Sequence, residues 1–317
     1  MTDGRAHGGE SPAGDGGGAA AAVERTVASL VDVAAAALRA SGTTSAVSEA
    51  RELVAALYDV PRFWPVANAH QVVSDEMWER ARHAIDRRVH GAPLAYAVGH
   101  AAFRHLTLYV DERVLIPRPE TEQLVDLVLE AVRGDAGILD GGVAVDVGTG
   151  SGAIALALAS EARFETVYGT DVSTDALAVA RTNAARAQAS LRANVEFFAG
   201  SLLAPLPPCT ARVIVSNPPY IALSEAPALP ASVRDWEPSV ALFGGVDGMQ
   251  PTAQLVREAP AVLEPGGLLA LEVDVRRASL VAELVSRDPR WASVQVVLDL
   301  TGRERFVLAR RSSRRGG

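Results

Sequence analysis

A short apolar run that ends in a glycine-rich turn constrains the fold of this chain more than any other feature. Residues 143–147 have the composition of a buried strand, residues 148–152 read Gly-Thr-Gly-Ser-Gly, and a helix-forming run follows directly. The glycines allow positive φ angles, and the first turn of the helix offers free N–H groups. A strand, a turn and a helix in this order build a nucleotide-type pocket at the carboxyl end of the strand.

Short apolar runs alternate with helical stretches after this turn. Helices are predicted from Gly152, from Thr174 and near 278–285, and strands are predicted at 143–147, 166–169, 195–198, 213–215, 268–273, 294–298 and 306–308. Such alternation is typical of parallel strands joined by crossover helices, so we predict a doubly wound α/β sheet. The last two strands follow each other without a helix, which predicts an antiparallel end to the sheet.

The first part of the chain has a helical pattern instead. Apolar residues recur at three- and four-residue spacing near 30–38, 46–57 and 75–89. Period-two stretches at 106–110 and 114–116 then predict a β-hairpin. The predicted organisation is a disordered tail at 1–22, a helical docking domain at 23–100, a β-hairpin linker at 101–122, an α/β domain at 123–311 and a flexible tail at 312–317.

Composition narrows the setting in which the chain acts. A length of 317 residues corresponds to about two domains, and 49% hydrophobic with 21% charged residues excludes a fibrous or wholly disordered protein. The net charge of −8 disfavours extensive nucleic-acid wrapping. The single cysteine, Cys209, indicates a reducing compartment, and no apolar run approaches the ~20 residues of a membrane helix. We expect a monomer in the cytosol with no membrane association, no sequence-specific nucleic acid and no metal site.

The glycine turn fits two cofactors. Gly148, Gly150 and Ala153 satisfy a relaxed dinucleotide pattern, and Asp171 follows the next strand at the spacing of a ribose-binding acid. By itself this motif does not separate NAD from S-adenosylmethionine. Asp146, inside the strand before the turn, favours the second cofactor, because a carboxylate attracts a sulfonium and an ammonium but repels a pyrophosphate.

Asp171 also has a structural interpretation. An aspartate between a strand and a helix can simply cap that helix. Ser173 or Thr174 can take this role instead, which leaves Asp171 free to bind ribose hydroxyls.

The strand at 213–215 leads into a second motif, Asn217-Pro218-Pro219-Tyr220. Two prolines cannot continue a central strand, so we predict a stiff loop at the same sheet edge as the glycine turn. The Asn217 side-chain oxygen and the Pro218 carbonyl can each accept one N–H of a planar amide or amine, and Tyr220 can lie over its face. Such a nitrogen is a poor nucleophile, so the loop would act by orienting it toward a methyl donor. A rigid turn without chemistry is the alternative.

In combination these motifs resemble the class I S-adenosylmethionine-dependent methyltransferases that modify amino or amide nitrogens. That group includes DNA adenine, RNA guanine and protein glutamine enzymes. Further stretches are similar to the bacterial release factor glutamine N5-methyltransferase family, namely 93–99 followed by Phe103, 116–122, 237–238, 241–248 and 302–305. The resemblance runs from about Ala46 to the C-terminus.

The resemblance implies a seven-stranded Rossmann-like sheet and a specific reaction. A methyl group would pass from S-adenosylmethionine to the side-chain amide nitrogen of the glutamine in the Gly-Gly-Gln motif of class I peptide chain release factors. The residues implied to bind the cofactor are Gly148, Thr149, Gly150, Ser151, Gly152, Asp171, Leu202 and Asn217. Those implied to bind the substrate are Asn217, Pro218, Pro219 and Tyr220, of which Asn217, Pro218 and Tyr220 are the implied catalytic residues.

Several positions depart from the family pattern and keep alternatives open. Ala95 stands where the family usually has glutamine, and Ser201 and Leu202 stand where it commonly has an acid and an aromatic residue near the adenine. Residues 272–274 lack the glycine and the later glutamine that are often seen there. Another protein glutamine is therefore an alternative target. A methyltransferase of nucleic-acid bases, DNA adenine or ribosomal RNA guanine, would use the same loop, although the acidic net charge and the lack of a basic stripe disfavour it. A binding module without catalysis is disfavoured by the intact motif at 217–220.

Overall fold

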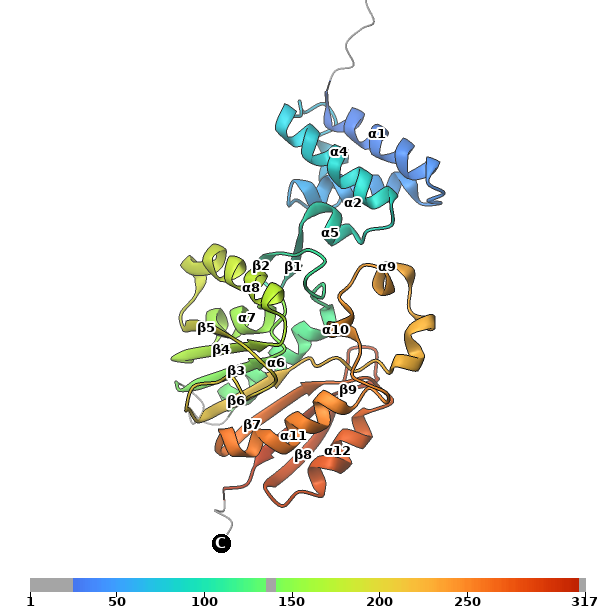
Figure 1. The fold of residues 1–317 in the computed structure, drawn as a ribbon. Helices are drawn as coiled ribbons and strands as arrows, with labels where there is room; N and C mark the ends of the chain where they lie inside the picture. Colours follow the sequence, from blue (N-terminus) through green and yellow to red (C-terminus); the bar gives the residue numbers. More distant parts are fainter. Residues whose placement is uncertain (1–24, 135–140, 314–317) are drawn as a thin grey trace, which may run out of the picture. The chain divides into compact units, whose positions relative to one another are not determined.

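The computed structural model describes residues 25–134 and 141–313. The predicted tail at 1–22 and the last four residues of the predicted tail at 312–317 lie outside the described residues. The chain divides into two compact units, Met1–Arg82 and His83–Gly317, and the division falls inside helix α4 (Asp75–Val89) (Figure 1).

The described part of the first unit is helical, as the apolar spacing predicts. Helix α1 (Val27–Ala40) packs against α2 (Ala46–Leu57), and the short α3 (Trp64–Ala67) contacts both. The largest fully buried side chains of this unit are Leu30, Leu38 and Leu53. They come from the predicted apolar stripes, so burial of these stripes holds α1 and α2 together.

A β-hairpin is present, but it lies earlier than predicted. Strand β1 (His100–Phe103) pairs antiparallel with β2 (Leu106–Tyr109), and residues 114–116 form no strand. Arg104 adopts a left-handed φ of 55° at the turn between them. The predicted strand at 114–116 is wrong because its alternation has another cause: Val114 is buried in the wall of a cavity without joining a ladder.

The second unit is built on a mixed seven-stranded sheet with the order β5-β4-β3-β6-β7-β9-β8. Its strands are β3 (Val143–Val147), β4 (Thr166–Asp171), β5 (Asn194–Ala199), β6 (Ala211–Ser216), β7 (Leu263–Glu272), β8 (Trp291–Leu298) and β9 (Glu304–Arg311). The first five strands of this order are parallel, and β9 runs antiparallel to both β7 and β8. The seven predicted strands and the antiparallel end of the sheet are confirmed.

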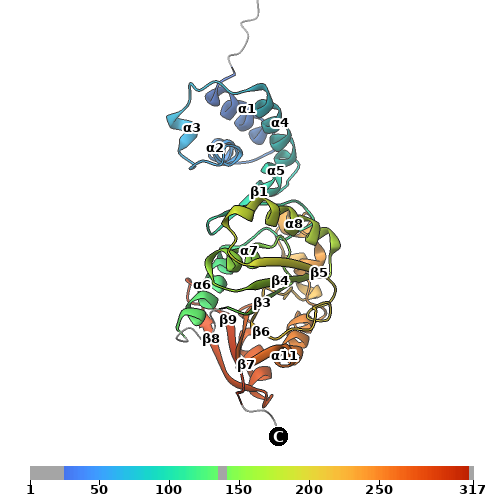
Figure 2. The same ribbon diagram turned by 90° about the vertical axis from the view of Figure 1, so that its left-hand side faces the viewer.

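Helices cover both faces of this sheet, which confirms the doubly wound arrangement (Figure 2). One face carries α6 (Pro119–Gly134), α7 (Ala153–Glu161) and α8 (Thr174–Ala187), and the other carries α11 (Gln250–Val262) and α12 (Ala278–Ser286). Alternate residues of β6 point to the two cores: Val213 and Val215 belong to the first, and Ile214 to the second. Helices α6 and α11 have no counterpart among the predicted helices.

Several short helices connect the main elements. They are α5 (Leu94–Val98), η1 (Gln188–Ser190), η2 (Leu223–Ala228), α9 (Ala231–Arg234) and α10 (Ser239–Leu242). The last three lie in the long connection from β6 to α11, at the carboxyl edge of the parallel strands. No helix within 25–134 or 141–313 combines the length and the apolar character that crossing a membrane requires.

Candidate active site

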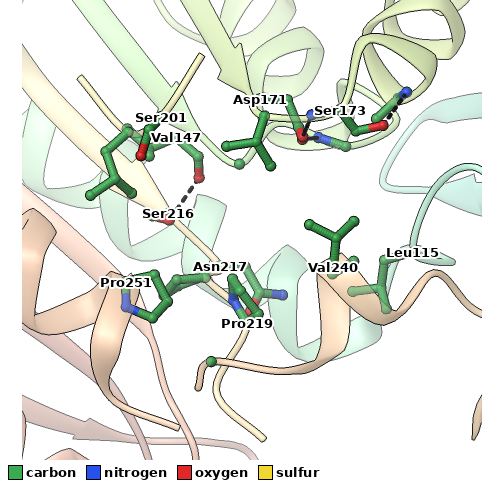
Figure 3. Close-up of a pocket in the computed structure, with 18 of the residues that line it drawn as sticks. Leu115, Val147, Asp171, Ser173, Ser201, Ser216, Asn217, Pro219, Val240 and Pro251 are labelled. Atoms are coloured by element: carbon green, nitrogen blue, oxygen red, sulfur yellow. Dashed lines mark hydrogen bonds between the residues drawn. The ribbon is translucent and has the colours of Figure 1, made fainter. Parts of the chain in front are cut away.

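A cavity of about 330 Å³ lies at the carboxyl ends of the central parallel strands. Its wall includes Gly150 from the turn after β3, Asp171 at the end of β4 and Asn217 after β6. Parallel strands end at one edge of the sheet, which brings the two predicted motifs together. Figure 3 shows Asp171 on one side of the cavity and Asn217 with Pro219 on the opposite side.

The glycines of the turn have two different tasks. Gly148 and Gly150 have φ angles of 73° and 53° and line the cavity, and a Cβ atom added to either would meet nothing within 4 Å. Open space therefore lies over their backbone, where a ligand can approach. Gly152 is the N-cap of α7 and has a φ of 83°, and a Cβ atom there would come within 3.3 Å of the Ala180 Cβ atom. Gly152 thus serves the packing of α7 against α8.

The residues between these glycines are buried and make hydrogen bonds that stabilise the turn. The Thr149 hydroxyl donates to Asp146 Oδ2 over 2.6 Å, and the Ala155 N–H donates to the same oxygen over 3.0 Å. Ser151 is buried, and its carbonyl accepts a hydrogen bond from the Asn183 amide. The sequence predicts cofactor binding by Thr149, Ser151 and Gly152, but none of these three residues lines the cavity.

Asp146 is fully buried beneath the turn. Burial raises the pKa of its carboxyl group to about 7, against the opposing effect of the hydrogen bonds from Thr149 and Ala155. Within the described residues its second oxygen, Oδ1, has no hydrogen-bond partner. Because Asp146 does not line the cavity, the attraction for a positively charged ligand expected from the sequence would act through the turn and not by contact.

Asp171 links the turn to the end of β4. Its Oδ2 accepts the Gly150 N–H and its Oδ1 accepts the Ser173 N–H, each over 2.9 Å (Figure 3). The Ser173 side chain caps α8 by accepting the Ala176 N–H, which confirms that Asp171 is not needed as the cap. Burial raises the pKa of Asp171. Each carboxylate oxygen retains acceptor capacity for a ligand hydroxyl.

The loop after β6 contributes an amide to the cavity. Asn217, Pro218 and Pro219 line the wall, and the Asn217 Nδ2 atom donates to Thr121 Oγ1 over 3.1 Å. Tyr220 is half-buried and is not among the lining residues. Burial raises its pKa to about 12, so its hydroxyl stays neutral at physiological pH.

Two glycines brace this loop at very short range. Gly244 donates its N–H to the Ile221 carbonyl over 3.0 Å. A Cβ atom at Gly244 would lie 2.3 Å from the Pro219 carbonyl oxygen, and one at Gly248 would lie 2.2 Å from the Tyr220 carbonyl oxygen. Only glycine therefore allows the segment at 244–248 to pack against the loop.

Much of the remaining wall comes from segments without a local motif. These residues are Arg113, Val114, Leu115, Pro238, Val240, Ala241, Phe243, Gly244, Gly245, Gln250, Pro251 and Gln254. The only sequence signal was the family resemblance at 237–238 and 241–248, which overlaps part of this wall.

The chemistry of the wall favours a ligand with an apolar ring and hydroxyl groups. Leu202, Val240 and Phe243 supply apolar surface, and Asp171 is the sole carboxylate among the lining residues that the structure describes. Arg113 is the sole lining guanidinium in the same set, and it forms an ion pair with Asp111 at 2.6 Å. Leu202 has a left-handed φ of 49°, a conformation that costs energy for a residue with a side chain.

Two family models match the chain. A model described as Methyltransferase small domain matches residues 125–228, and one described as PrmC N-terminal domain matches residues 29–99. Relatives named release factor glutamine methyltransferase include a Deinococcus radiodurans protein, 39% identical over 89% of this chain and 98% of the relative. A Moorella thermoacetica relative is 43% identical over 72% and 78%, and a Gloeobacter violaceus relative is 40% identical over 76% and 80% of the two chains.

Proposed function

The chain belongs to the release factor glutamine methyltransferase family, and we propose that it methylates the glutamine of the Gly-Gly-Gln motif in a class I peptide chain release factor. The methyl group comes from S-adenosylmethionine, and the acceptor is the side-chain amide nitrogen. One observation carries the proposal: Asn217 and Pro218 share a single cavity with Gly148, Gly150 and Asp171. A methyl donor and an amide held in one cavity react without the entropic cost of meeting in solution.

The residues present fit S-adenosylmethionine. The open space over Gly148 and Gly150 admits the ligand to the backbone, and the Asp171 carboxylate accepts ribose hydroxyls. Leu202 contributes apolar surface for the base. When bound, the cofactor supplies a methyl group on a positively charged sulfur, so that transfer to an amide nitrogen leaves a neutral thioether and releases one proton.

The loop after β6 holds the substrate amide. The Asn217 Oδ1 atom and the Pro218 carbonyl oxygen each accept one N–H of the glutamine amide, and the two prolines keep these acceptors at a fixed separation. Tyr220 does not line the cavity, so we assign the contacts with the amide to Asn217 and Pro218, and the raised pKa of Tyr220 keeps its hydroxyl neutral. Catalysis is then mainly orientation of the nitrogen, and no strong base is required.

The helical stretch at the start of the chain supports a release factor as the protein substrate. The match to the PrmC N-terminal domain model covers the helical stretch at 29–99, and this stretch docks the release factor in our proposal. We also propose that the protein acts as a monomer in the cytosol. Light scattering of the purified protein alone and with the release factor tests the stoichiometry.

Peptide mass spectrometry tests the reaction itself. The full chain is incubated with S-adenosylmethionine and a recombinant release factor, with duplex DNA and ribosomal RNA as parallel substrates. A single methyl group on the Gly-Gly-Gln glutamine is the expected result. A methyl group on another glutamine, or on nucleic acid with an unmodified release factor, would overturn it.

Asn217→Ala tests the assigned loop. Loss of the acceptor oxygen lowers the rate of methyl transfer at least about 100-fold. Calorimetry shows a Kd of S-adenosylmethionine within about threefold of that of the unaltered protein. Asn194→Ala is the matched control, because Asn194 is an exposed amide on β5 outside the cavity. Unchanged methyl transfer in Asn217→Ala contradicts the assignment.

A further inference from the structure

A hydrogen-bond chain leads away from Asn217 into the protein interior. The Asn217 Nδ2 atom donates to Thr121 Oγ1 over 3.1 Å, and the Thr121 hydroxyl donates to Glu272 Oε2 over 2.8 Å. Thr121 lies in the first turn of α6, and Glu272 is the last residue of β7. Both are buried, with 5% and 1% of their surfaces exposed. Three separate elements therefore meet behind one wall of the cavity.

The direction of each hydrogen bond in the series from Asn217 to Glu272 is fixed when Glu272 is ionised. A carboxylate can only accept hydrogen bonds, so the single proton of the Thr121 hydroxyl points to Glu272. The Thr121 oxygen can then only accept, which requires the Asn217 amino group, not its oxygen, to face it. The two ends of an asparagine amide are nearly equal in size, so packing alone does not choose between them.

This direction determines what Asn217 presents to a ligand. With its amino group turned to Thr121, the amide offers its oxygen elsewhere, and Asn217 lines the cavity. Within residues 25–134 and 141–313, Asn217 Oδ1 makes no hydrogen bond. A reversed amide would offer an amino group to the amino group of a substrate amide, which is a contact between two donors.

We propose that Thr121 and Glu272 are positioning residues that keep Asn217 Oδ1 available as the acceptor for the glutamine N–H. The inference rests on the proposed function for the identity of the substrate. Neither residue touches the substrate in this proposal, and both act through Asn217. It makes α6 and the end of β7 part of the machinery that orients the nucleophile.

The direction of these hydrogen bonds depends on pH, because it depends on the charge of Glu272. Burial raises the pKa of Glu272 to about 7, and the bond from Thr121 opposes that rise. The charged and titratable groups around Glu272 are Arg305 and Arg118, which lower its pKa, and Glu120, which raises it, together with the nearby Tyr220. Once protonated, the Glu272 carboxyl group can donate a hydrogen bond to the Thr121 oxygen. The Thr121 hydroxyl can then donate to Asn217, so that both hydrogen bonds reverse their direction.

Steady-state kinetics at saturating S-adenosylmethionine provide the first test. Thr121→Val removes the hydroxyl group that links Asn217 to Glu272. The kcat then falls about 10- to 100-fold, while the Kd of S-adenosylmethionine stays within about twofold of the value for the unaltered protein. Thr121→Ser keeps the hydroxyl and restores kcat to within about threefold. Thr252→Val is the matched control, since Thr252 is a buried threonine of α11 outside the cavity, and it leaves kcat unchanged. Unchanged kcat in Thr121→Val, or equal loss in Thr121→Ser, overturns the proposal.

Side-chain NMR gives a readout that needs no methyl transfer. The ¹⁵N signal of the Asn217 amide is assigned by its absence in Asn217→Ala and followed from pH 5.5 to 8.5. It shifts with a midpoint near the pKa of Glu272, and this shift disappears in both Glu272→Gln and Thr121→Val. A titration that survives in Glu272→Gln comes from another group, such as Asp146, and one that survives in Thr121→Val does not pass through Thr121. Either result overturns the proposal.

The two tests separate the inference from the function on which it rests. If the unaltered protein methylates the release factor and Thr121→Val does so equally well, the positioning role fails and the function stands. If the release factor stays unmodified while the Asn217 signal follows Glu272, the function fails and the hydrogen-bond chain stands. Glu272→Gln keeps the shape of the side chain, so the NMR test survives even where Thr121→Val does not fold.

Discussion

The Gly150 N–H donates to Asp171 Oδ2 over 2.9 Å, so the turn after β3 is held by the acid at the end of β4. Asp171 therefore both shapes the cavity wall and presents a carboxylate to it. Its other oxygen accepts the Ser173 N–H, which leaves no place for an amide –NH₂ group without a contact between two donors.

Asp171→Asn should weaken S-adenosylmethionine binding at least about tenfold, because one backbone N–H loses its acceptor together with the proposed contact to a ribose hydroxyl. Isothermal calorimetry measures the change directly. Asp175→Asn is the control, since Asp175 is an exposed acid in the first turn of α8. The affinity of this variant for S-adenosylmethionine should match that of the unaltered protein. Equal affinity in both variants would falsify the assigned role of Asp171.

Gly244→Ala should lower methyl transfer at least about tenfold, because the added Cβ atom meets the Pro219 carbonyl oxygen at 2.3 Å and must displace the loop. The comparison is Gly266→Ala. Gly266 has a φ of 82°, and a Cβ atom there meets nothing within 4 Å, so the change costs about 1 kcal/mol of stability and leaves activity intact. Activity assays with circular dichroism melts separate the two effects. Normal activity in Gly244→Ala contradicts the bracing role.

Asp146→Asn should stabilise the protein above neutral pH. Between its ordinary value of 3.8 and the raised pKa of about 7, folded Asp146 keeps a proton that the unfolded chain has lost. The stability contributed by this group is therefore lost as the pH rises through that window. The advantage of the asparagine variant should grow by about 1–3 kcal/mol from pH 5 to pH 8 in urea unfolding. A difference that stays constant across this range contradicts the raised pKa.

Arg118→Ala should destabilise the second unit. Arg118 pairs with Glu237 at 2.6 Å, and the Glu237 side chain is only 1% exposed, so the variant leaves a buried carboxylate without its cation. The Arg118 side chain is 32% exposed, so we expect a loss of about 2 kcal/mol, less than for a fully buried pair. Arg287→Ala breaks an exposed pair with Glu283 and should leave the urea midpoint unchanged. Equal midpoints for both variants count against a structural role of the Arg118 pair.

The sequence was most informative where function follows from local order along the chain. The strand, turn and helix at 143–158 and the loop at 217–220 each lie at the end of a parallel strand, and such ends meet at one sheet edge. That rule predicts from the sequence that Gly148, Gly150 and Asp171 lie beside Asn217, as the cavity wall confirms. Hydrophobic periodicity similarly located the seven strands of the sheet.

The sequence was least informative where alternation had more than one cause. Residues 114–116 have the pattern of a strand, but Val114 and Leu115 form part of the cavity wall, and the real hairpin turns at Arg104. Thr149 and Ser151 sit in the glycine motif yet face the interior. Periodicity reports burial, and burial beneath a turn, in a wall or in a ladder gives the same pattern.

By itself the sequence determined the fold class, the order of its strands along the chain and the two motifs of the cavity, because these depend on short-range periodicity and on residues with special backbone geometry. Only the tertiary structure decided which atoms of those motifs face the ligand. The contact of Thr121 with Asn217 spans 96 positions and its contact with Glu272 spans 151. Hydrogen bonds over such separations leave no local pattern, since they exist only after packing has removed water from both partners.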